Sequence, residues 1–158
     1  MKILMIVESK HLGNTMKIAK AMSEVAPITI TNTEKAKQYK LEDYELVGFA
    51  SGIYAWRHDK KLLDFARAIS DENGYSFVVS TSGGADFDSN NKTLIDILKT
   101  KNKTVLGVFS CLALDKFSFL KLLGGINKGH PDETDLKNAQ EFILEIISKY
   151  NSVNNINN

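Results

Sequence analysis

Short apolar runs alternate along the chain with longer stretches whose apolar residues recur every three or four positions. The runs have the length of strands, and most are apolar at both odd and even positions. This pattern is typical of strands that are covered on both faces of a sheet. We therefore expect strands at residues 2–7, 28–30, 46–50, 75–80 and 104–110.

Amphipathic stretches fill most of the intervals between these runs. Their helical spacing predicts helices at residues 14–25, 59–70, 91–101 and 132–150. The interval 31–44 is polar, so any helix there is expected to be short and exposed. The last residues, 151–158, are polar and are expected to form a disordered tail.

Strands that alternate with helices predict an α/β fold. The pattern favours a doubly wound five-stranded parallel sheet of order 2-1-3-4-5, with right-handed crossovers and helices on both faces. The length of 158 residues fits one domain, which we place at residues 1–150. Ligands of such sheets bind beyond the carboxyl ends of the strands, beside the first strand, where the strand order reverses.

Composition excludes several functions. The formal net charge of +1 gives no overall field that would attract nucleic acid or an anionic membrane. No apolar stretch approaches the roughly 20 residues that cross a bilayer, and Glu8 follows the apolar start too soon for a signal peptide. The single cysteine, Cys111, excludes an internal disulfide and a multi-cysteine metal centre. We expect a cytoplasmic protein.

The segment SKHLGNT, residues 9–15, lies between the first expected strand and the first expected helix. Gly13 allows the backbone to approach a ligand closely, and the N–H groups at a helix start attract anions. Ser9 and Thr15 add hydroxyl groups. A simple turn with a helix cap accounts for the same residues, so this loop alone does not decide. It lacks the Gly-Lys-Ser/Thr of a nucleoside triphosphate site and the G-x-G-x-x-G of a dinucleotide site.

Two further loops at the same edge are unusual. The segment ASGIYAWRHD, residues 50–59, places Tyr54 and Trp56 outside the expected core, and STSGGADFD, residues 80–88, combines two glycines with several hydroxyl groups. Taken singly, aromatic packing on a helix surface and a flexible connector explain them. Together with the first loop, they predict a site for a ligand with a phosphate at one end and a planar heteroaromatic ring at the other.

These stretches resemble short-chain flavodoxin-like proteins, a family that binds FMN. The resemblance covers residues 1–150. It is most specific at GNT (13–15), FASGIYAW (49–56), STSGG (80–84) and LKLLGGINKGHPDETDLKNA (120–139). It implies a flavodoxin-like fold and FMN as the cofactor.

The resemblance also implies which residues contact FMN: the first loop would hold the phosphate, and the other two would flank the isoalloxazine ring. In the usual first loop, Ser/Thr-x-Thr-Gly-x-Thr, the middle threonine supplies a hydroxyl that is missing here, and this loop is one residue longer. We expect Lys10 or His11 to supply the missing donor. Gly52 is the expected flexible peptide beside the flavin. The implied residues are Ser9, Lys10, His11, Leu12, Gly13, Asn14, Thr15, Ser51, Gly52, Ile53, Tyr54, Trp56, Ser82, Gly83 and Gly84.

Charge near the second loop differs from that of well-known flavodoxins, which are strongly acidic. Here Arg57, His58, Lys60 and Lys61 stand against Asp59 alone. Positive charge favours an anionic reduced flavin. We therefore expect a less negative potential for the second reduction step than in acidic flavodoxins.

The resemblance implies an FMN-binding redox protein that carries electrons between cytoplasmic partners, namely redox proteins or a reductase. One alternative is an FMN-dependent NAD(P)H oxidoreductase, whose nicotinamide cofactor would meet the basic side chains. A second is an interaction domain of the same fold without a cofactor. A homodimer stays open. A phospho-accepting receiver domain is excluded, because Glu8, Ser51 and Ser110 stand where it needs an acidic pair, an aspartate and a lysine.

The connection 110–132 is long for a compact domain. A short helix on the sheet edge is the expected structure, with a dimer patch or a wall over the flavin as alternatives. Cys111 is expected to be an inert, half-buried thiol. We find no acidic or cysteine partner at ligand spacing for His58 or His130, so no metal is expected. No residue is predicted to be catalytic.

Overall fold

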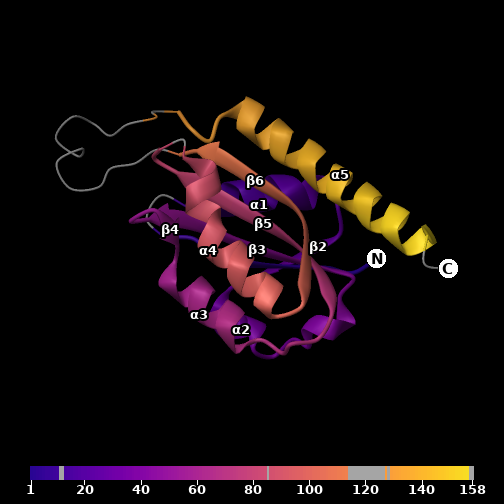
Figure 1. Cartoon of the computed structure of the whole chain (residues 1–158). Coiled ribbons are helices and arrows are strands. Elements are labelled where there is room, and N and C mark those ends of the chain that lie inside the picture. Colours follow the sequence, from indigo (N-terminus) through magenta and orange to yellow (C-terminus); the bar gives the residue numbers. More distant parts are fainter. Residues whose placement is uncertain (11–12, 85, 114–126, 128, 157–158) are drawn as a thin grey trace.

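The computed structural model describes residues 1–10, 13–84, 86–113, 127 and 129–156 (Figure 1). Strands and helices alternate along this part of the chain. The strands are β1 (Ile3–Glu8), β2 (Ile28–Thr31), β3 (Leu46–Tyr54), β4 (Arg57–His58), β5 (Gly74–Ser82) and β6 (Lys103–Leu112). The helices are α1 (Asn14–Val25), α2 (Thr33–Ala36), the 3₁₀ helix η1 (Leu41–Asp43), α3 (Lys60–Ala68), α4 (Phe87–Thr100) and α5 (Glu133–Ile156).

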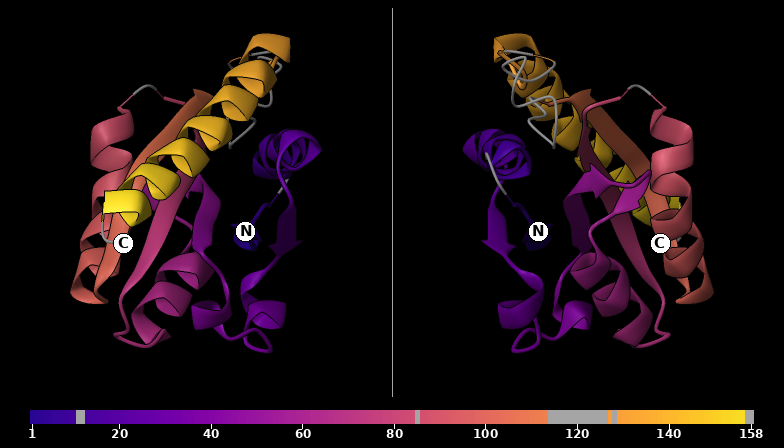
Figure 2. Two further views of the ribbon diagram at one scale, coloured as in Figure 1. Left: turned by 90° about the vertical axis from the view of Figure 1, so that its right-hand side faces the viewer. Right: turned by 90° about the vertical axis from the view of Figure 1, so that its left-hand side faces the viewer.

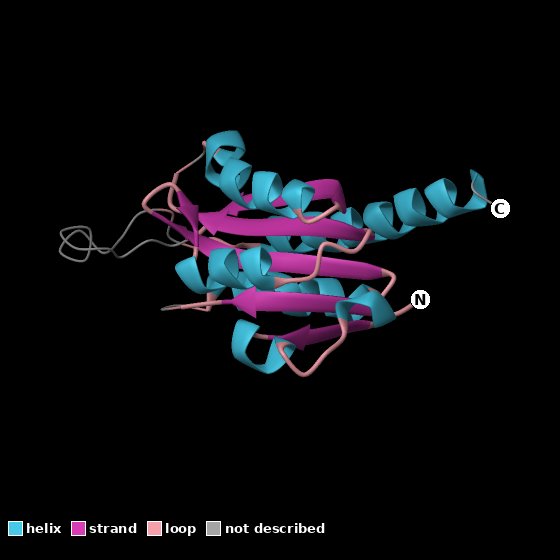
Figure 3. Cartoon of the chain, turned by 60° about the horizontal axis from the view of Figure 1, so that its bottom comes forward, coloured by secondary structure: helices cyan, strands magenta, loops and turns pink. Residues whose placement is uncertain are grey.

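Five of the described strands form a parallel sheet in the order β2-β1-β3-β5-β6. The sixth, β4, is a two-residue strand that pairs antiparallel with the end of β3. The order of the parallel strands is therefore the predicted 2-1-3-4-5, and the α/β doubly wound fold is confirmed. Figure 3 shows the parallel arrows ending at one edge of the sheet, from which the loops after β1, β3 and β5 leave.

Helices cover both faces of the sheet (Figure 2). Met5 of β1 packs in a cluster with α1 and α5, whereas Leu4 and Ile6 pack in a second cluster with α3 and α4. All three side chains are fully buried. This two-sided burial explains why β1 appears in the sequence as a continuous apolar run and not as an alternating one.

The polar interval 31–44 forms two short elements, α2 and η1. The Asn32 side chain caps α2 by accepting a hydrogen bond from the Lys35 backbone N–H at 2.9 Å. The prediction of a short helix is confirmed, but the prediction that it is exposed is wrong, because Thr33 and Ala36 are buried. Two of its four residues are small enough to pack against the sheet without a long apolar stripe.

The last helix, α5, runs to Ile156, so residues 151–156 are helical where the sequence analysis expects a disordered tail. Tyr150 packs edge-on against Tyr75 of β5, with ring centroids 5.2 Å apart. Extending an anchored helix adds one hydrogen bond per residue without a new nucleation step, so polar residues can continue it. None of the described helices combines the length and apolar character that a membrane crossing requires.

Candidate cofactor site

The first loop leads from β1 into α1 through Gly13. This residue is the N-cap of α1 and has a positive φ of 68°, a conformation that glycine adopts without strain. Ser9 Oγ accepts a hydrogen bond from the Met16 backbone N–H at 3.3 Å and so covers one N–H group of the first turn. A Cβ atom at Gly13 would meet no described atom within 4 Å. The start of α1 therefore borders open space at Gly13.

The other implied residues of this loop have different surroundings. Asn14 is the first residue of α1 and is partly exposed. The Thr15 hydroxyl is buried and lies 2.8 Å from the hydroxyl of Thr81 at the end of β5. Its side chain therefore joins β5 to α1. His11 and Leu12 lie outside the described residues.

The second loop is a hairpin, which the sequence analysis does not predict. Strand β3 continues four residues past its predicted end to Tyr54, and Arg57–His58 returns antiparallel as β4. Ala55 and Trp56 form the turn with positive φ values of 48° and 61°. Hairpin turns with two positive φ angles usually contain Asn or Gly, so the residue types give no signal for this turn.

The aromatic side chains of this hairpin lie differently. Trp56, at the turn, is 76% exposed. Tyr54 is partly buried and folds back along β3 over Gly52. Its Oη is so close that a Cβ atom at Gly52 would lie 2.8 Å from it. Ile53 pairs with His58 and is partly buried. The hairpin thus carries one exposed ring at its tip and one phenol over the expected flavin peptide.

A buried chain of hydrogen bonds fixes the base of the hairpin. His58 Nδ1 lies 2.8 Å from Ser51 Oγ, and Nε2 lies 2.9 Å from Asn91 Oδ1 on α4. Asn91 Nδ2 in turn donates to Ser110 Oγ at 2.9 Å, and Ser110 Oγ lies 2.8 Å from Ser80 Oγ. Ser51, His58 and Asn91 are each at most 2% exposed. This chain connects β3, β4, α4, β6 and β5 behind the carboxyl edge.

Burial keeps His58 uncharged near neutral pH. Its imidazole is 1% exposed, and the loss of water lowers its pKa to about 4, although the hydrogen bond with Asn91 acts in the opposite direction. The sequence analysis counts His58 among the basic groups of the second loop. Because its imidazole is neutral, His58 does not add to the positive charge of the second loop near neutral pH.

Ser51 Oγ has several partners. It accepts a hydrogen bond from the Asp59 backbone N–H at 3.0 Å and lies 2.8 Å from both His58 Nδ1 and the Gly52 carbonyl oxygen. A hydroxyl has a single proton, so His58 Nδ1 and the Gly52 carbonyl compete for it whenever the imidazole is neutral and Nε2 carries its proton. Ser51 therefore couples the Gly52 peptide to the buried histidine.

Lys10 extends from the first loop to the hairpin. Its Nζ lies 2.5 Å from Asp59 Oδ2 and 5.4 Å from the centroid of the Tyr54 ring. The carboxylate raises the pKa of Lys10 and so keeps the ammonium charged. Neither the pairing of Lys10 with Asp59 nor the role of Asn91 could be read from local sequence, because the partners are far apart along the chain.

The third loop closes around the side chain of Ser82. Its Oγ accepts hydrogen bonds from the Gly84 backbone N–H at 3.0 Å and from Asn90 Nδ2 at 3.3 Å, and donates to the Gly84 carbonyl. Asn127 Nδ2 donates to the Gly83 carbonyl at 2.9 Å. A Cβ atom at Gly84 would meet no described atom within 4 Å. Gly84, like Gly13, therefore borders open space.

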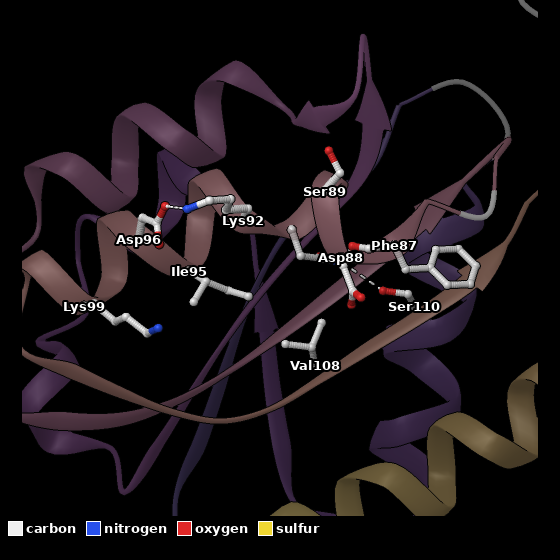
Figure 4. Close-up of a pocket in the computed structure, with 10 residues that line it drawn as sticks. Phe87, Asp88, Ser89, Lys92, Ile95, Asp96, Lys99, Val108 and Ser110 are labelled. Atoms are coloured by element: carbon white, nitrogen blue, oxygen red, sulfur yellow. Dashed lines mark hydrogen bonds and ion pairs between the residues drawn. The ribbon is translucent and has the colours of Figure 1, made fainter.

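A groove of about 700 Å³ lies between α4 and the edge strand β6 (Figure 4). Val108 of β6 faces Ile95 of α4 across it, Ser110 lies below Phe87, and Lys92 pairs with Asp96 at 2.6 Å along its rim. The groove shares Ser110 and Asn91 with the buried hydrogen-bond chain but contains none of the implied cofactor residues.

The statement that His130 lacks an acidic partner is wrong. Its Nδ1 lies 2.6 Å from Asp135 Oδ2, and Asp132 is also within ligand distance of both groups. Asp132 and Asp135 accept hydrogen bonds from each other's backbone N–H groups at 2.9 Å. This reciprocal pattern is a capping box at the start of α5, and it accounts for the cluster.

Cys111 is more deeply buried than expected, with 5% of its surface exposed. Burial raises the pKa of its thiol to about 12, so the reactive thiolate is scarce at neutral pH. The expected helix, dimer patch or wall in the connection 110–132 falls on residues 114–126 and 128, which lie outside the described residues.

Comparison with known proteins places the chain in a family. The flavodoxin domain family matches residues 4–122, and the chain belongs to it. A protein of Methanocaldococcus jannaschii, described only as uncharacterized, is 40% identical over 148 residues, covering 93% of this chain and 99% of its own length.

Solved structures show the same fold at low identity. Oxidised flavodoxin 2 from Bacillus cereus is 15% identical with a TM-score of 0.70, over 94% of this chain and 99% of that one. A flavodoxin from Fusobacterium nucleatum, bound to flavin mononucleotide, is 14% identical with a TM-score of 0.66, over 94% and 98% of the two chains.

Proposed function

We propose that this protein binds FMN at the carboxyl edge of its sheet and carries electrons between cytoplasmic partner proteins. The observation that carries the proposal is the arrangement of that edge. The start of α1 at Gly13 and the third loop at Gly84 border open space there, beside a hairpin with two aromatic side chains. Family membership and the FMN found in the Fusobacterium flavodoxin support the same ligand.

The first loop fits a phosphate. Backbone N–H groups at a helix start attract anions, and Gly13 has no side chain to exclude them. Ser9 would add a hydroxyl donor, and Asn14 lies at the first position of the helix. Thr15 would contribute its backbone, because its hydroxyl is already bonded to Thr81 in the interior.

The hairpin and the third loop fit a planar ring. Tyr54 and Trp56 offer aromatic surface, and Gly84 leaves backbone accessible. When bound, FMN supplies the one- and two-electron chemistry. Ser51 holds the Gly52 carbonyl from the interior side and so orients the peptide that would face the ring.

The test is to add FMN to cofactor-free protein and follow flavin fluorescence, which protein stacking quenches. We expect quenching that saturates at one FMN per chain. Absence of quenching would favour the interaction domain without a cofactor.

A second arm separates the carrier from the reductase. NADH or NADPH is added without oxygen to the protein loaded with FMN. A carrier leaves the flavin absorbance unchanged over minutes, whereas rapid bleaching would show that the chain is an NAD(P)H oxidoreductase.

A further inference from the structure

Lys10 is an exposed residue whose cation pairs with a fully buried carboxylate. The Lys10 side chain is 47% exposed, whereas the Asp59 side chain has no exposed surface, and Nζ and Oδ2 are 2.5 Å apart. Apart from this contact, no hydrogen bond reaches Asp59 Oδ2 from the described residues. A buried carboxylate without a partner is costly, so Lys10 is its counter-ion.

Asp59 is also hydrogen-bonded to α3 and to Ser51 at the base of the hairpin. Its Oδ1 caps α3 by accepting a hydrogen bond from the Lys61 backbone N–H at 2.8 Å. Its own backbone N–H donates to Ser51 Oγ at 3.0 Å. Movement of Asp59 would therefore disturb the cap of α3 through its carboxylate and Ser51, next to Gly52, through its backbone N–H.

Lys10 is also tied to the first loop. Its carbonyl accepts a hydrogen bond from the Gly13 backbone N–H at 3.4 Å, next to the start of α1. Glu8 is the acidic residue nearest to Lys10 along the chain, but it does not replace Asp59 as the partner of Lys10. Glu8 Oε1 instead accepts hydrogen bonds from the Thr33 backbone N–H and hydroxyl at 3.1 and 2.5 Å.

We propose that the ion pair of Lys10 and Asp59 is a strap that couples the phosphate loop to the aromatic hairpin, and that Lys10 is a positioning residue and not a ligand of the phosphate. The inference rests on the proposed FMN site. The ion pair connects the part of the site that would hold the ring to the part that would hold the phosphate. Its loss should therefore loosen both parts equally. Lys10 lies over Tyr54, which in turn lies over Gly52.

Riboflavin, which has the ring but not the phosphate, separates a strap from a phosphate ligand. Dissociation constants of FMN and riboflavin are measured by fluorescence quenching for the wild type, Lys10→Met, Asp59→Asn and the double variant. Asparagine still caps a helix, so the second variant keeps α3. Lys20 is an exposed lysine of α1, the helix that follows the first loop, and Lys20→Met is the control for lost charge.

We expect Lys10→Met and Asp59→Asn each to weaken both flavins by the same factor, about tenfold. The double variant should bind no more weakly than either single one, because the two residues act through one contact. Lys10→Arg keeps the cation and should retain most of the affinity for both flavins. Lys20→Met should bind both flavins as tightly as the wild type.

A Lys10→Met protein that loses affinity for FMN but keeps it for riboflavin would show that Lys10 binds the phosphate and would overturn the strap. So would unchanged affinity for both flavins, or losses that add in the double variant. A wild type that binds neither flavin would overturn the proposed function itself, a result distinct from all of these.

Discussion

The first loop and the β3–β4 hairpin lie side by side at the carboxyl edge, yet their polar groups face in different directions. At the first loop, Gly13 places the start of α1 against open space. At the base of the hairpin, Ser51 and His58 are buried and bonded to Asn91. Hydroxyl and imidazole groups near such an edge therefore do not by themselves mark a ligand site. Burial and hydrogen-bond partners separate groups that hold the edge in place from groups that can contact a ligand.

The largest expected effect is a loss of stability in acid that comes from His58. Its folded pKa is about 4 and the ordinary value is 6.5, so the unfolded chain binds more protons between these values. The stabilising contribution is complete above pH 6.5, falls as the pH drops toward 4, and amounts to roughly 3 kcal/mol. Urea unfolding at pH 7, 6, 5 and 4 measures it.

His58→Gln is the control for this titration. The pKa of His130 is raised by Asp135, so its contribution has the opposite sign and is lost as the pH rises. It is present in both proteins and cancels in their difference. Equal pH dependence in the two proteins would mean that His58 is not held neutral in the interior.

The second expected effect is on the buried chain itself. Asn91→Ala removes one hydrogen-bond partner from His58 and one from Ser110, and leaves His58 Nε2 buried without a partner. We expect the free energy of unfolding at pH 7 to fall by about 2 kcal/mol. Ser89→Ala, an exposed position on the same helix, is the comparison. Equal losses in the two variants would count against the chain as a structural device.

The third prediction compares two glycines that both border open space. Gly13→Ala places a side chain at a positive φ and should lower the free energy of unfolding by about 1 kcal/mol. Gly84→Ala lacks that strain and should change it by less than about 0.5 kcal/mol. Both should weaken FMN binding, because each adds a methyl group at the proposed site. A stable Gly84→Ala protein with unaltered FMN affinity would remove the third loop from the site.

The smallest stability effect is expected at the tip of the hairpin. Trp56 is 76% exposed, so Trp56→Ala should change the free energy of unfolding by less than about 0.5 kcal/mol. Its FMN affinity should fall, because an exposed ring at this edge has its main partner in the ligand. If the free energy of unfolding drops while FMN affinity stays constant, Trp56 packs on the protein and does not contact the ligand. The tip of the hairpin would then be structural, like its base.

The parallel sheet could be predicted because its strands are apolar on both faces, as Leu4 and Met5 show, and its order follows from the alternation with helices. The hairpin could not be predicted, because Ala55 and Trp56 adopt positive φ values that their residue types do not announce. At the site, the sequence indicates the three loops but not which polar groups turn inward. That depends on contacts such as His58 with Asn91, which only the fold brings together.

Amide chemical shifts during an FMN titration show whether FMN binds at this edge of the sheet or elsewhere. We expect the largest shifts at Gly13 to Met16, at Gly52 to Arg57 and at Gly83 and Gly84. Residues of the α4–β6 groove, such as Lys92 and Asp96, should move little. Shifts that are largest in that groove would place FMN there instead, and a spectrum that FMN leaves unchanged would show that the protein does not bind it.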